Sequence, residues 1–336
     1  MTVLNEEAHL AECVAEVLSQ DYPGEMEFIL ALGPSRDRTD KIAYKLAAAD
    51  PRVRIVPNPA GVTPTGLNEA IRTARHDIIA RVDGHGILSP GYLRRSVELL
   101  EDTGAANVGG LMVAVGRTGF EEAVAKAYGS RIGLGGGTFH VGGPEGPADT
   151  VYLGVFRREA LEAVGCYDEA YHRAQDWELN LRIRQAGHTV WFSPELRVYY
   201  RPRSSLKELA RQFFRTGQWR REVMRQYPET VQARYLAPPV ATTAIGLGVV
   251  AGTAAVVPAV DDWLHLGWLA PATYAGVAVG AAVVGGRSMS WRARAWLPVV
   301  LGTIHLCWGT GFLTGLAAGK RKRVAQERAR QLTLSS

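Results

Sequence analysis

The sequence predicts an α/β fold, built on a doubly wound and mostly parallel sheet and followed by apolar helices of membrane-spanning length. Short apolar runs alternate with amphipathic stretches over roughly the first two-thirds of the 336 residues, as parallel strands do with their crossover helices. The remainder instead holds long uncharged stretches, the first from Leu236 to Val260. With 47% hydrophobic residues the chain has ample material for a buried core.

Strands and helices alternate from the start of the chain. Val3-Leu4 resembles the end of a strand whose beginning is missing, so we expect the native protein to start upstream of Met1. A helix is expected over 5–19, because Asn5 can cap it and apolar residues follow at helical spacing. The next expected elements are a strand at 26–32, a helix at 39–49, a strand at 53–56, a helix around 67–74 and a strand at 77–82.

A glycine-rich segment follows in the middle of the chain. Residues 133–147 contain seven glycines and two prolines, too many for a helix or a central strand, and a mobile loop is predicted there. The elements expected beyond it are a strand at 151–156, a helix at 158–164, the acidic stretch 175–178 and a basic amphipathic helix at 205–226.

Three C-terminal stretches can cross a bilayer, at 236–260, 266–286 and 296–318, since each supplies the roughly 20 apolar residues that a spanning helix needs. We therefore expect a transmembrane region at 236–319 and a basic cytosolic or juxtamembrane tail at 320–336. The alternative, buried helices of a second soluble domain, is disfavoured because three uncharged stretches of this length are rare in such domains.

The charge pattern favours a membrane surface over nucleic acid as partner. The net charge is +5, and the basic residues crowd at the edges of the apolar stretches. A cytosolic globular part would place Asp261-Asp262 outside and Arg287–Arg294 inside, as the positive-inside tendency prefers. A third full crossing would then place Lys320–Arg323 outside, so either one segment is re-entrant or the tendency fails at the tail. The three cysteines are widely spaced, which favours a reducing cytosolic location.

Asp83-Gly84-His85 comes directly after a predicted strand, at the sheet edge where ligands bind in such folds. Residues two apart at a strand end can together hold a metal ion and a phosphate or ribose. The alternative is an ordinary turn, since Asp-Gly is a common turn dipeptide.

Asp176 stands at the predicted start of a helix, just after the glycine-rich segment, and is a candidate general base. Glu178 would point to another side of that helix. The alternatives are a helix N-cap for Asp176 and a surface charge for Glu178.

Arg215-Thr216-Gly217-Gln218-Trp219 lies shortly before the first apolar stretch. It can place an arginine and an aromatic ring beside a phosphate and a sugar. The alternative, compatible with the first, is a basic amphipathic helix lying on anionic lipid.

In this order, the motifs resemble glycosyltransferase family 2, the inverting enzymes of GT-A fold, and within it the membrane-anchored bacterial branch similar to succinoglycan-type glucosyltransferases. The resemblance covers about residues 1–230, which are then the catalytic domain, and includes Thr2-Val3-Leu4-Asn5-Glu6-Glu7 as the opening motif. It implies the following roles: Glu6, Asp37 and Asp83 at the nucleotide sugar, Asp83 and His85 at a Mg²⁺ or Mn²⁺ ion, Asp176 as general base, and Glu178, Arg215, Gln218 and Trp219 at the acceptor or diphosphate.

Five residues depart from the family pattern. Thr2 replaces a proline, Leu32-Gly33 stand where paired aspartates are usual, His85 replaces an aspartate and Gln218 an arginine. The change at His85 lowers the negative charge offered to a divalent cation, since imidazole suits Mn²⁺ less well than carboxylate.

The resemblance implies a multi-pass protein of the cell membrane with a cytoplasmic catalytic domain. It would transfer a hexose, glucose from UDP-glucose by first expectation, to a polyprenyl-diphosphate-linked saccharide in exopolysaccharide biosynthesis, with membrane lipids as further partners and no nucleic acid. The alternatives are a processive polysaccharide synthase and a catalytically inactive membrane scaffold that binds sugar.

Overall fold

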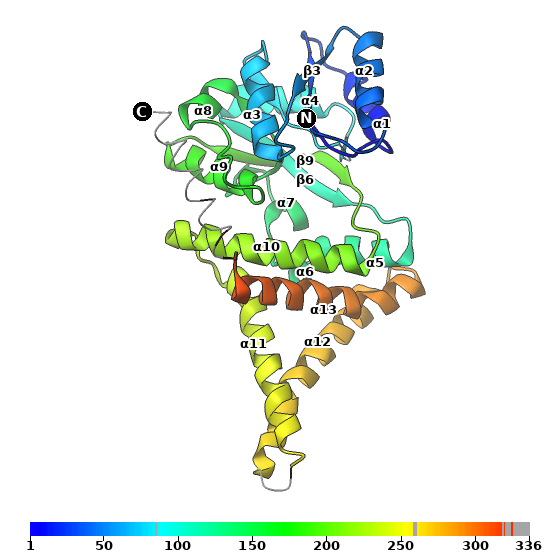
Figure 1. Ribbon diagram of the computed structural model, residues 1–336, viewed down its shortest axis with the longest axis vertical. Helices are drawn as coiled ribbons and strands as arrows, with labels where there is room; N and C mark the ends of the chain where they lie inside the picture. Colours follow the sequence, from blue (N-terminus) through cyan, green and yellow to red (C-terminus); the bar gives the residue numbers. More distant parts are fainter. Residues whose placement is uncertain (85, 258–260, 318, 320–323, 325–336) are drawn as a thin grey trace. The chain divides into compact units, whose positions relative to one another are not determined.

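The computed structural model describes the 336-residue chain except for residues 85, 258–260, 318, 320–323 and 325–336 (Figure 1). The described residues form two compact units. The first comprises Met1–Val113 with Thr138–Tyr200, and the second comprises Ala114–Gly137 with residues 201–317. The first unit has the predicted α/β architecture, and the second holds the apolar helices.

A three-stranded parallel sheet begins the first unit, in the order β1-β2-β3. β2 is apolar throughout and buried over its first four residues, as a strand covered on both faces should be. The strands are β1 (Thr2–Val3), β2 (Phe28–Leu32) and β3 (Val53–Pro57), and the helices are α1 (Leu10–Leu18), α2 (Thr39–Ala49) and α3 (Thr63–Thr73).

A second sheet of six strands has the order β4-β8-β6-β9-β5, with β7 beside β9. The pairs β4/β8, β6/β8, β5/β9 and β7/β9 are antiparallel, so the expectation of a mostly parallel arrangement holds for the sheet β1-β2-β3 and not for this one. Its strands are β4 (Ile78–Ala80), β5 (Gly86–Leu88), β6 (Asn107–Ala114), β7 (Gly146–Pro147), β8 (Tyr152–Arg157) and β9 (Val190–Tyr200). Its helices are α4 (Tyr92–Thr103), α7 (Thr138–Val141), α8 (Arg158–Ala163) and α9 (Gln175–Gln185).

One hydrophobic cluster joins the two sheets of the first unit. It contains Leu30 of β2, Leu88 of β5 and Val155 of β8, each at most 3% exposed. Side chains of α1 and α4 fill the space beside them. This shared core holds the carboxyl ends of β1 and β4 within one unit.

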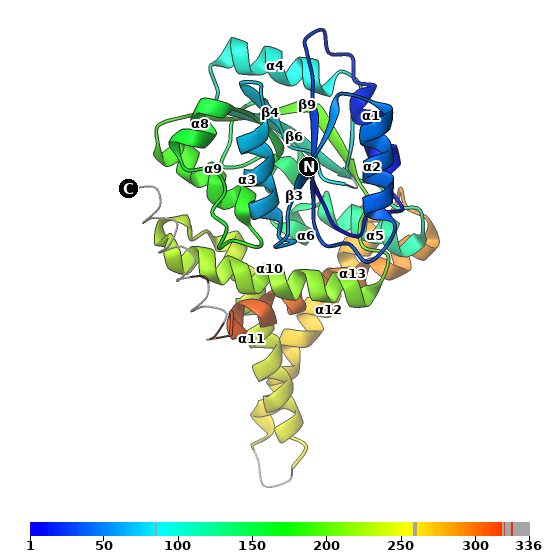
Figure 2. The ribbon, with the colours of Figure 1, turned by 45° about the horizontal axis from the view of Figure 1, so that its top comes forward.

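The second unit is helical. Three of its helical segments are long and apolar enough to cross a membrane: Ala233–Ala254, Asp262–Gly285 and Trp291–Thr314. α11 and α12 form a hairpin, whereas α13 runs along α10 (Figures 1 and 2). The elements are α5 (Gly119–Tyr128), α6 (Arg131–Leu134), α10 (Leu206–Gln226), η1 (Pro228–Thr230), α11 (Ala233–Ala254), η2 (Asp262–Trp268), α12 (Leu269–Gly285) and α13 (Trp291–Thr314).

Two local expectations were wrong. Asn5 does not cap a helix: its φ is 56°, its side chain accepts a hydrogen bond from the Arg36 N–H at 2.8 Å, and α1 begins only at Leu10. The glycine-rich segment is not a plain loop, because it contains α7 and β7. Thr138–Val141 is its longest glycine-free run, and the helix forms there.

Candidate active site

The carboxyl ends of β1 and β4 bring two acidic residues together. Glu6 follows β1, and its N–H donates to Thr39 Oγ1 at 2.8 Å. Asp83 and Gly84 follow β4, and a Cβ atom on Gly84 would lie 3.1 Å from Cγ and Cδ of Glu6. The Glu6 side chain therefore rests against Gly84, and any larger residue at 84 would displace it.

Arg81 links Asp83 to Asp176. Its side chain, one residue beyond β4, is only 6% exposed. Nε and Nη2 donate to Oδ1 of Asp83 at 3.2 and 3.0 Å, and Nη1 donates to Oδ1 of Asp176. A single guanidinium thus holds the strand-end carboxylate and the helix-start carboxylate on either side of itself.

The surroundings of Arg81 keep it charged. Burial on its own would lower the pKa of Arg81, but Asp83 and the Tyr167 hydroxyl raise it, and the pKa lies above the ordinary value for arginine. The guanidinium also lies over the Tyr167 ring, with 5.9 Å from Cζ to the ring centroid. Asn68 fixes Tyr167 by accepting from its N–H and donating to its carbonyl, both at 2.9 Å.

Sequence reasoning missed Arg81, although a signal was present. Side chains two apart in an extended segment point to the same face, so Arg81 and Asp83 had to share one. Arg81 also interrupts the otherwise apolar run Ile78–Val82, and a charged residue there needs a partner if it is buried. One of the partners of Arg81 is Asp176, which is distant in sequence and which only the fold brings close to Arg81.

Asp176 is the second residue of α9 and does not cap the helix. The N-cap is Ala174, with φ of 61° and no side-chain cap bond. The Asp176 side chain is 36% exposed and accepts from Arg81. A partly exposed carboxylate held by one cation can meet a substrate hydroxyl, as a general base must.

Asp37 joins two loops of the site. Its Oδ1 accepts from the Thr39 hydroxyl at 2.5 Å and from the Thr39 N–H at 3.0 Å, while Oδ2 accepts from the Glu7 N–H at 3.3 Å. The Thr39 hydroxyl is the main reason that the pKa of Asp37 is lowered. Asp37 therefore connects the loop after β2 to the loop after β1. Its contact with a nucleotide stays a prediction.

Glu178 is not placed to contact an acceptor, and the prediction is corrected here. Its side chain is fully buried, and Arg182 donates to both its oxygens at 2.7 Å. Arg182 also donates to the carbonyls of Val164 and Cys166. Glu178 therefore orients an arginine that holds the segment after α8, because a buried carboxylate must be paired.

Arg215, Gln218 and Trp219 lie on α10, in the second unit. Arg215 is exposed, and the Gln218 amide donates to the Gly315 carbonyl at 2.8 Å. Trp219 is 2% exposed, so its ring is packed inside this unit and is not presented to a sugar, contrary to the prediction. The reason is that the apolar face of α10 is covered by other helices, α13 foremost.

The described residues do not form a ready metal site. Within them, no three His, Cys, Asp or Glu side chains are grouped to hold an ion. Asp83 is the strand-end carboxylate, and its Oδ1 already accepts from Arg81. His85, the other predicted ligand, lies outside the described residues. Asp83 would therefore need further oxygen ligands beside it to hold a divalent cation, which prefers several of them.

Comparisons with known proteins show which family and which fold the chain resembles. Residues 1–165 match the model of glycosyl transferase family 2. The chain is 32% identical over 306 residues to the succinoglycan biosynthesis protein ExoA of Rhizobium meliloti (strain 1021), covering 87% of this chain and 92% of that protein. It is 25% identical to a dolichyl N-acetyl-alpha-D-glucosaminyl phosphate 3-beta-D-2,3-diacetamido-2,3-dideoxy-beta-D-glucuronosyltransferase of Methanococcus voltae, covering 63% of this chain and 69% of that protein.

Among solved structures, the chain resembles the mannosyltransferase PcManGT from Pyrobaculum calidifontis in complex with GDP-Man and Mn²⁺. The TM-score is 0.61 at 18% identity, over 93% of this chain and 85% of that one. This likeness shows the fold alone and confirms the expected GT-A architecture. Together with the extent of the Rhizobium match, the family model leads to one conclusion: the chain belongs to glycosyltransferase family 2.

Proposed function

We propose that this glycosyltransferase moves glucose from UDP-glucose to a polyprenyl-diphosphate-linked saccharide, with inversion, in exopolysaccharide biosynthesis. The observation that carries the proposal is the bridge from Arg81 to both Asp83 and Asp176. The name of the Rhizobium relative supports a polysaccharide pathway, and the name of the Methanococcus relative supports a lipid-linked saccharide.

The proposed reaction uses the two sides of Arg81 differently. The acceptor hydroxyl oxygen bonds to the anomeric carbon while the bond from that carbon to the diphosphate oxygen breaks. The Asp176 carboxylate takes the hydroxyl proton, and the bond electrons leave with UDP. Attack from the face opposite the diphosphate inverts the anomeric centre. Asp83 would lie on the diphosphate side, where a bound cation would stabilise the developing negative charge, and Arg81 would hold Asp83 and Asp176 in place.

A divalent cation is part of the proposal, with the Mn²⁺ of the Pyrobaculum structure as its support. When bound, such an ion would offset charge on the diphosphate. Asp83 is the described residue that would hold it, together with the diphosphate oxygens. Since the single positive charge of Arg81 is already paired with Asp83 and Asp176, we expect chelation to lower both donor binding and the rate of transfer.

The apolar helices are proposed to anchor the protein in the cell membrane as a multi-pass protein, with the first unit on the cytoplasmic side. Three helical segments have the length and composition to span. Anchoring confines the enzyme to the surface that carries the lipid-linked acceptor, which raises the effective concentration of that acceptor.

Asp176→Asn tests the proposal. Asparagine keeps the shape and can still accept from Arg81, but it cannot take the proton. Transfer in a membrane fraction, followed with radiolabelled UDP-glucose and extracted lipid acceptor, is expected to fall by about 10²- to 10⁴-fold. Binding of UDP-glucose by calorimetry should change little. The matched control is Asp149→Asn, whose carboxylate pairs with Arg184 at 3.7 Å and is 51% exposed; it should retain full transfer.

Retained transfer in Asp176→Asn would reject the base assignment. No transfer by the unaltered enzyme from any nucleotide sugar, in the presence of lipid acceptor, would favour the inactive scaffold. A product of many sugars per acceptor, rather than one, would favour the processive synthase.

A further inference from the structure

Four exposed basic side chains lie at the turn between α12 and α13, within the second unit. They are Lys126 of α5, Arg287 of the turn itself, and Arg292 and Arg294 of α13. A Cβ atom on Gly285, the last residue of α12, would lie 3.9 Å from Cε of Lys126. One on Gly286 would lie 3.0 Å from Cγ of Arg294. The turn thus has a basic side chain from α5 on one side and one from α13 on the other.

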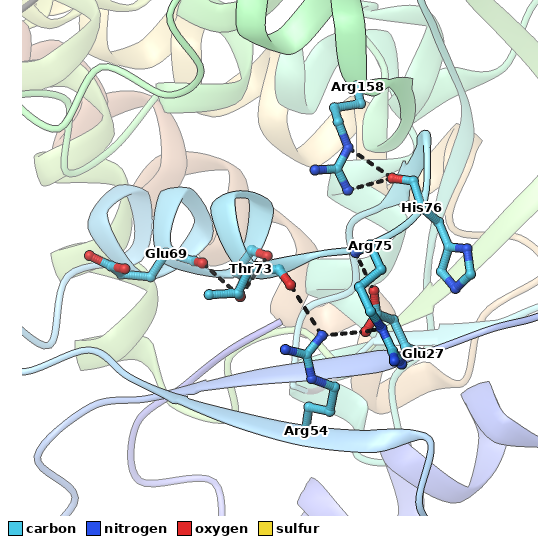
Figure 3. A network of polar contacts seen from close by, with 8 residues as sticks. Glu27, Arg54, Glu69, Thr73, Arg75, His76 and Arg158 are labelled. Carbon is cyan, nitrogen blue, oxygen red and sulfur yellow. Dashed lines mark hydrogen bonds and ion pairs between the residues drawn. The ribbon is translucent and has the colours of Figure 1, made fainter.

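Carboxylates do not neutralise these four side chains. The ion pairs of the described residues include none of them. Glu122 of α5 accepts instead from the N–H and the hydroxyl of Ser290, at 3.0 and 2.7 Å. In the first unit, by contrast, Arg54 and Arg75 share the Glu27 carboxylate at 2.5 and 3.1 Å (Figure 3). The turn therefore carries positive charge that no ion pair of the described residues offsets.

The end of α12 explains only part of this cluster. Arg294 Nη2 donates to the Val283 carbonyl at 3.3 Å, and a cation is favourable at the C-terminus of a helix. That effect is confined to the last turn. Arg292 lies elsewhere, because a Cβ atom on Gly119 at the start of α5 would come within 2.9 Å of its Cβ. Capping of α12 does not account for a basic residue there.

The first turns of α13 combine these charges with an exposed apolar stripe. Trp291, Ala295 and Val299 follow at intervals of four residues, so they share one side of the helix, and all three are exposed. At 3.6 residues per turn, Arg292 and Arg294 fall on opposite sides of this stripe. Trp291 is 75% exposed, and Cζ of Arg292 lies over its ring at 5.5 Å from the centroid. An apolar stripe flanked by cations is typical of a helix at a membrane–water interface.

A second indole lies on the same helix. Trp296 is 41% exposed, and its ring packs edge-to-face on Phe120 of α5 with 5.4 Å between centroids. Tryptophan rings favour the level of the lipid headgroups, where guanidinium groups can donate to phosphate oxygens. A headgroup with no positive charge of its own suits this cluster best. Phosphatidylcholine carries a quaternary ammonium that offsets its phosphate, whereas phosphatidylglycerol does not.

We propose that the turn between α12 and α13, with Lys126, Arg287, Arg292 and Arg294, binds the headgroup of an anionic phospholipid of the surrounding bilayer. A lipid, rather than free phosphate, is the occupant because its acyl chains would cover the exposed stripe beside the cations. The proposal rests on the proposed anchoring of the second unit in the membrane and holds whichever sugar the enzyme transfers.

Lipid binding to the detergent-solubilised full chain tests the proposal. Native mass spectrometry during titration with dioleoyl-phosphatidylglycerol or dioleoyl-phosphatidylcholine gives an affinity for each lipid. Phosphatidylglycerol is expected to bind at least about 10-fold more tightly, since each cation near a membrane surface strengthens attraction to anionic lipid about fivefold. The preference should shrink between about 50 and 500 mM salt, because exposed charges are screened. Equal affinities of the unaltered chain for the two lipids would overturn the proposal.

The combined variant Arg287→Gln, Arg292→Gln and Arg294→Gln should lose the preference for phosphatidylglycerol. Its Tm reports whether it is folded. Arg287→Gln alone, at an exposed turn residue, should lower the preference about fivefold and keeps the test independent of the Arg294 contact with α12. A preference that survives in both variants would reject the site.

The charge-matched control replaces three exposed arginines of the first unit, Arg72, Arg94 and Arg197, with glutamine. It should keep the full preference, and an equal loss in the control would show a response to net charge alone, against the proposal. Dimers that form without anionic lipid and dissociate in the combined variant would assign the turn to a second copy of the chain instead.

Alkaline carbonate extraction of membranes separates this proposal from the proposed anchoring. The unaltered chain and the combined variant are both expected in the pellet, since the apolar helices are unchanged. Release of the unaltered chain would reject the anchoring, and the lipid site with it. Retention of both chains, with equal preference for phosphatidylglycerol, would reject the lipid site alone.

Discussion

The Arg81 guanidinium uses three nitrogens at once, two on Asp83 and one on Asp176. A lysine has a single ammonium on a flexible stem and cannot hold two separate carboxylates in one geometry. Because Arg81 is 6% exposed, water does not readily replace a lost contact. We therefore propose Arg81 as a positioning residue for the proposed base.

Arg81→Lys is expected to lower kcat by about 10- to 100-fold, because a hydrogen bond to a charged group contributes roughly 1.5–3 kcal/mol. The control is Arg95→Lys, since Arg95 pairs with Glu195 at 2.7 Å at the surface of α4. A residue that acts through Asp176 loses its effect when that base is absent. Arg81→Lys should thus change little in the Asp176→Asn background. Equal effects in both backgrounds would reject coupling.

Sequence alone could assign Asp176 a role but could not show what holds it. Asp176 was found as an acid at a helix start, which is a local pattern. The link to Arg81 joins segments far apart in sequence and becomes visible only in the fold. Glu178 illustrates the converse, because its motif position suggested an acceptor contact whereas burial gives it Arg182. Local patterns identify residue types, and burial decides which of them reach a substrate.

Elements were predicted best where periodicity and boundaries agreed. α2 spans Thr39–Ala49 as expected, since an apolar face and a sharp end at Asp50 define it locally. α1 starts five residues after the expected cap because Asn5 bonds to the loop after β2, a contact between distant segments. The antiparallel pairing of β8 with β4 could not be predicted from local sequence either, because several other elements separate the two strands along the chain.

The packing of α10 on α13 depends on glycines. A Cβ atom on Gly217 would collide with the Trp308 carbonyl oxygen, and one on Gly311 with the Phe214 carbonyl oxygen. Two helix backbones can approach each other this closely only where small residues lie at the contact. The two helices are therefore as close as their backbones allow.

Gly217→Ala is expected to destabilise the second unit by about 1–3 kcal/mol, because backbone atoms cannot rotate out of the way. Thermal unfolding of the detergent-solubilised chain should show a lower Tm. Gly246→Ala is the control: Gly246 is on α11, a Cβ there meets nothing within 4 Å, and alanine favours helix. If the two variants have the same Tm, the close contact at Gly217 does not contribute to the stability of the second unit.

α13 differs from the other two apolar helices, α11 and α12, because polar contacts hold both of its ends. Its first turn meets α5, where Ser290 N and Oγ donate to Glu122 at 3.0 and 2.7 Å. Its last turn meets α10, where Arg221 Nη1 donates to the Leu313 carbonyl at 2.5 Å. α10 carries charges along its length and cannot lie in hydrocarbon. We propose on this basis that α13 does not cross the bilayer.

We therefore expect two crossings, by α11 and α12, with α13 along the cytoplasmic surface. This arrangement keeps Arg287 and the basic run 320–323 on one side, as the positive-inside tendency prefers; that run lies outside the described residues. Single cysteines in a cysteine-free background test it in intact cells. An impermeant maleimide should label Asp261→Cys directly, but Ser288→Cys and Ala317→Cys only after permeabilisation. All three positions are exposed in the structure. Direct labelling of Ala317→Cys would mean that α13 spans the membrane.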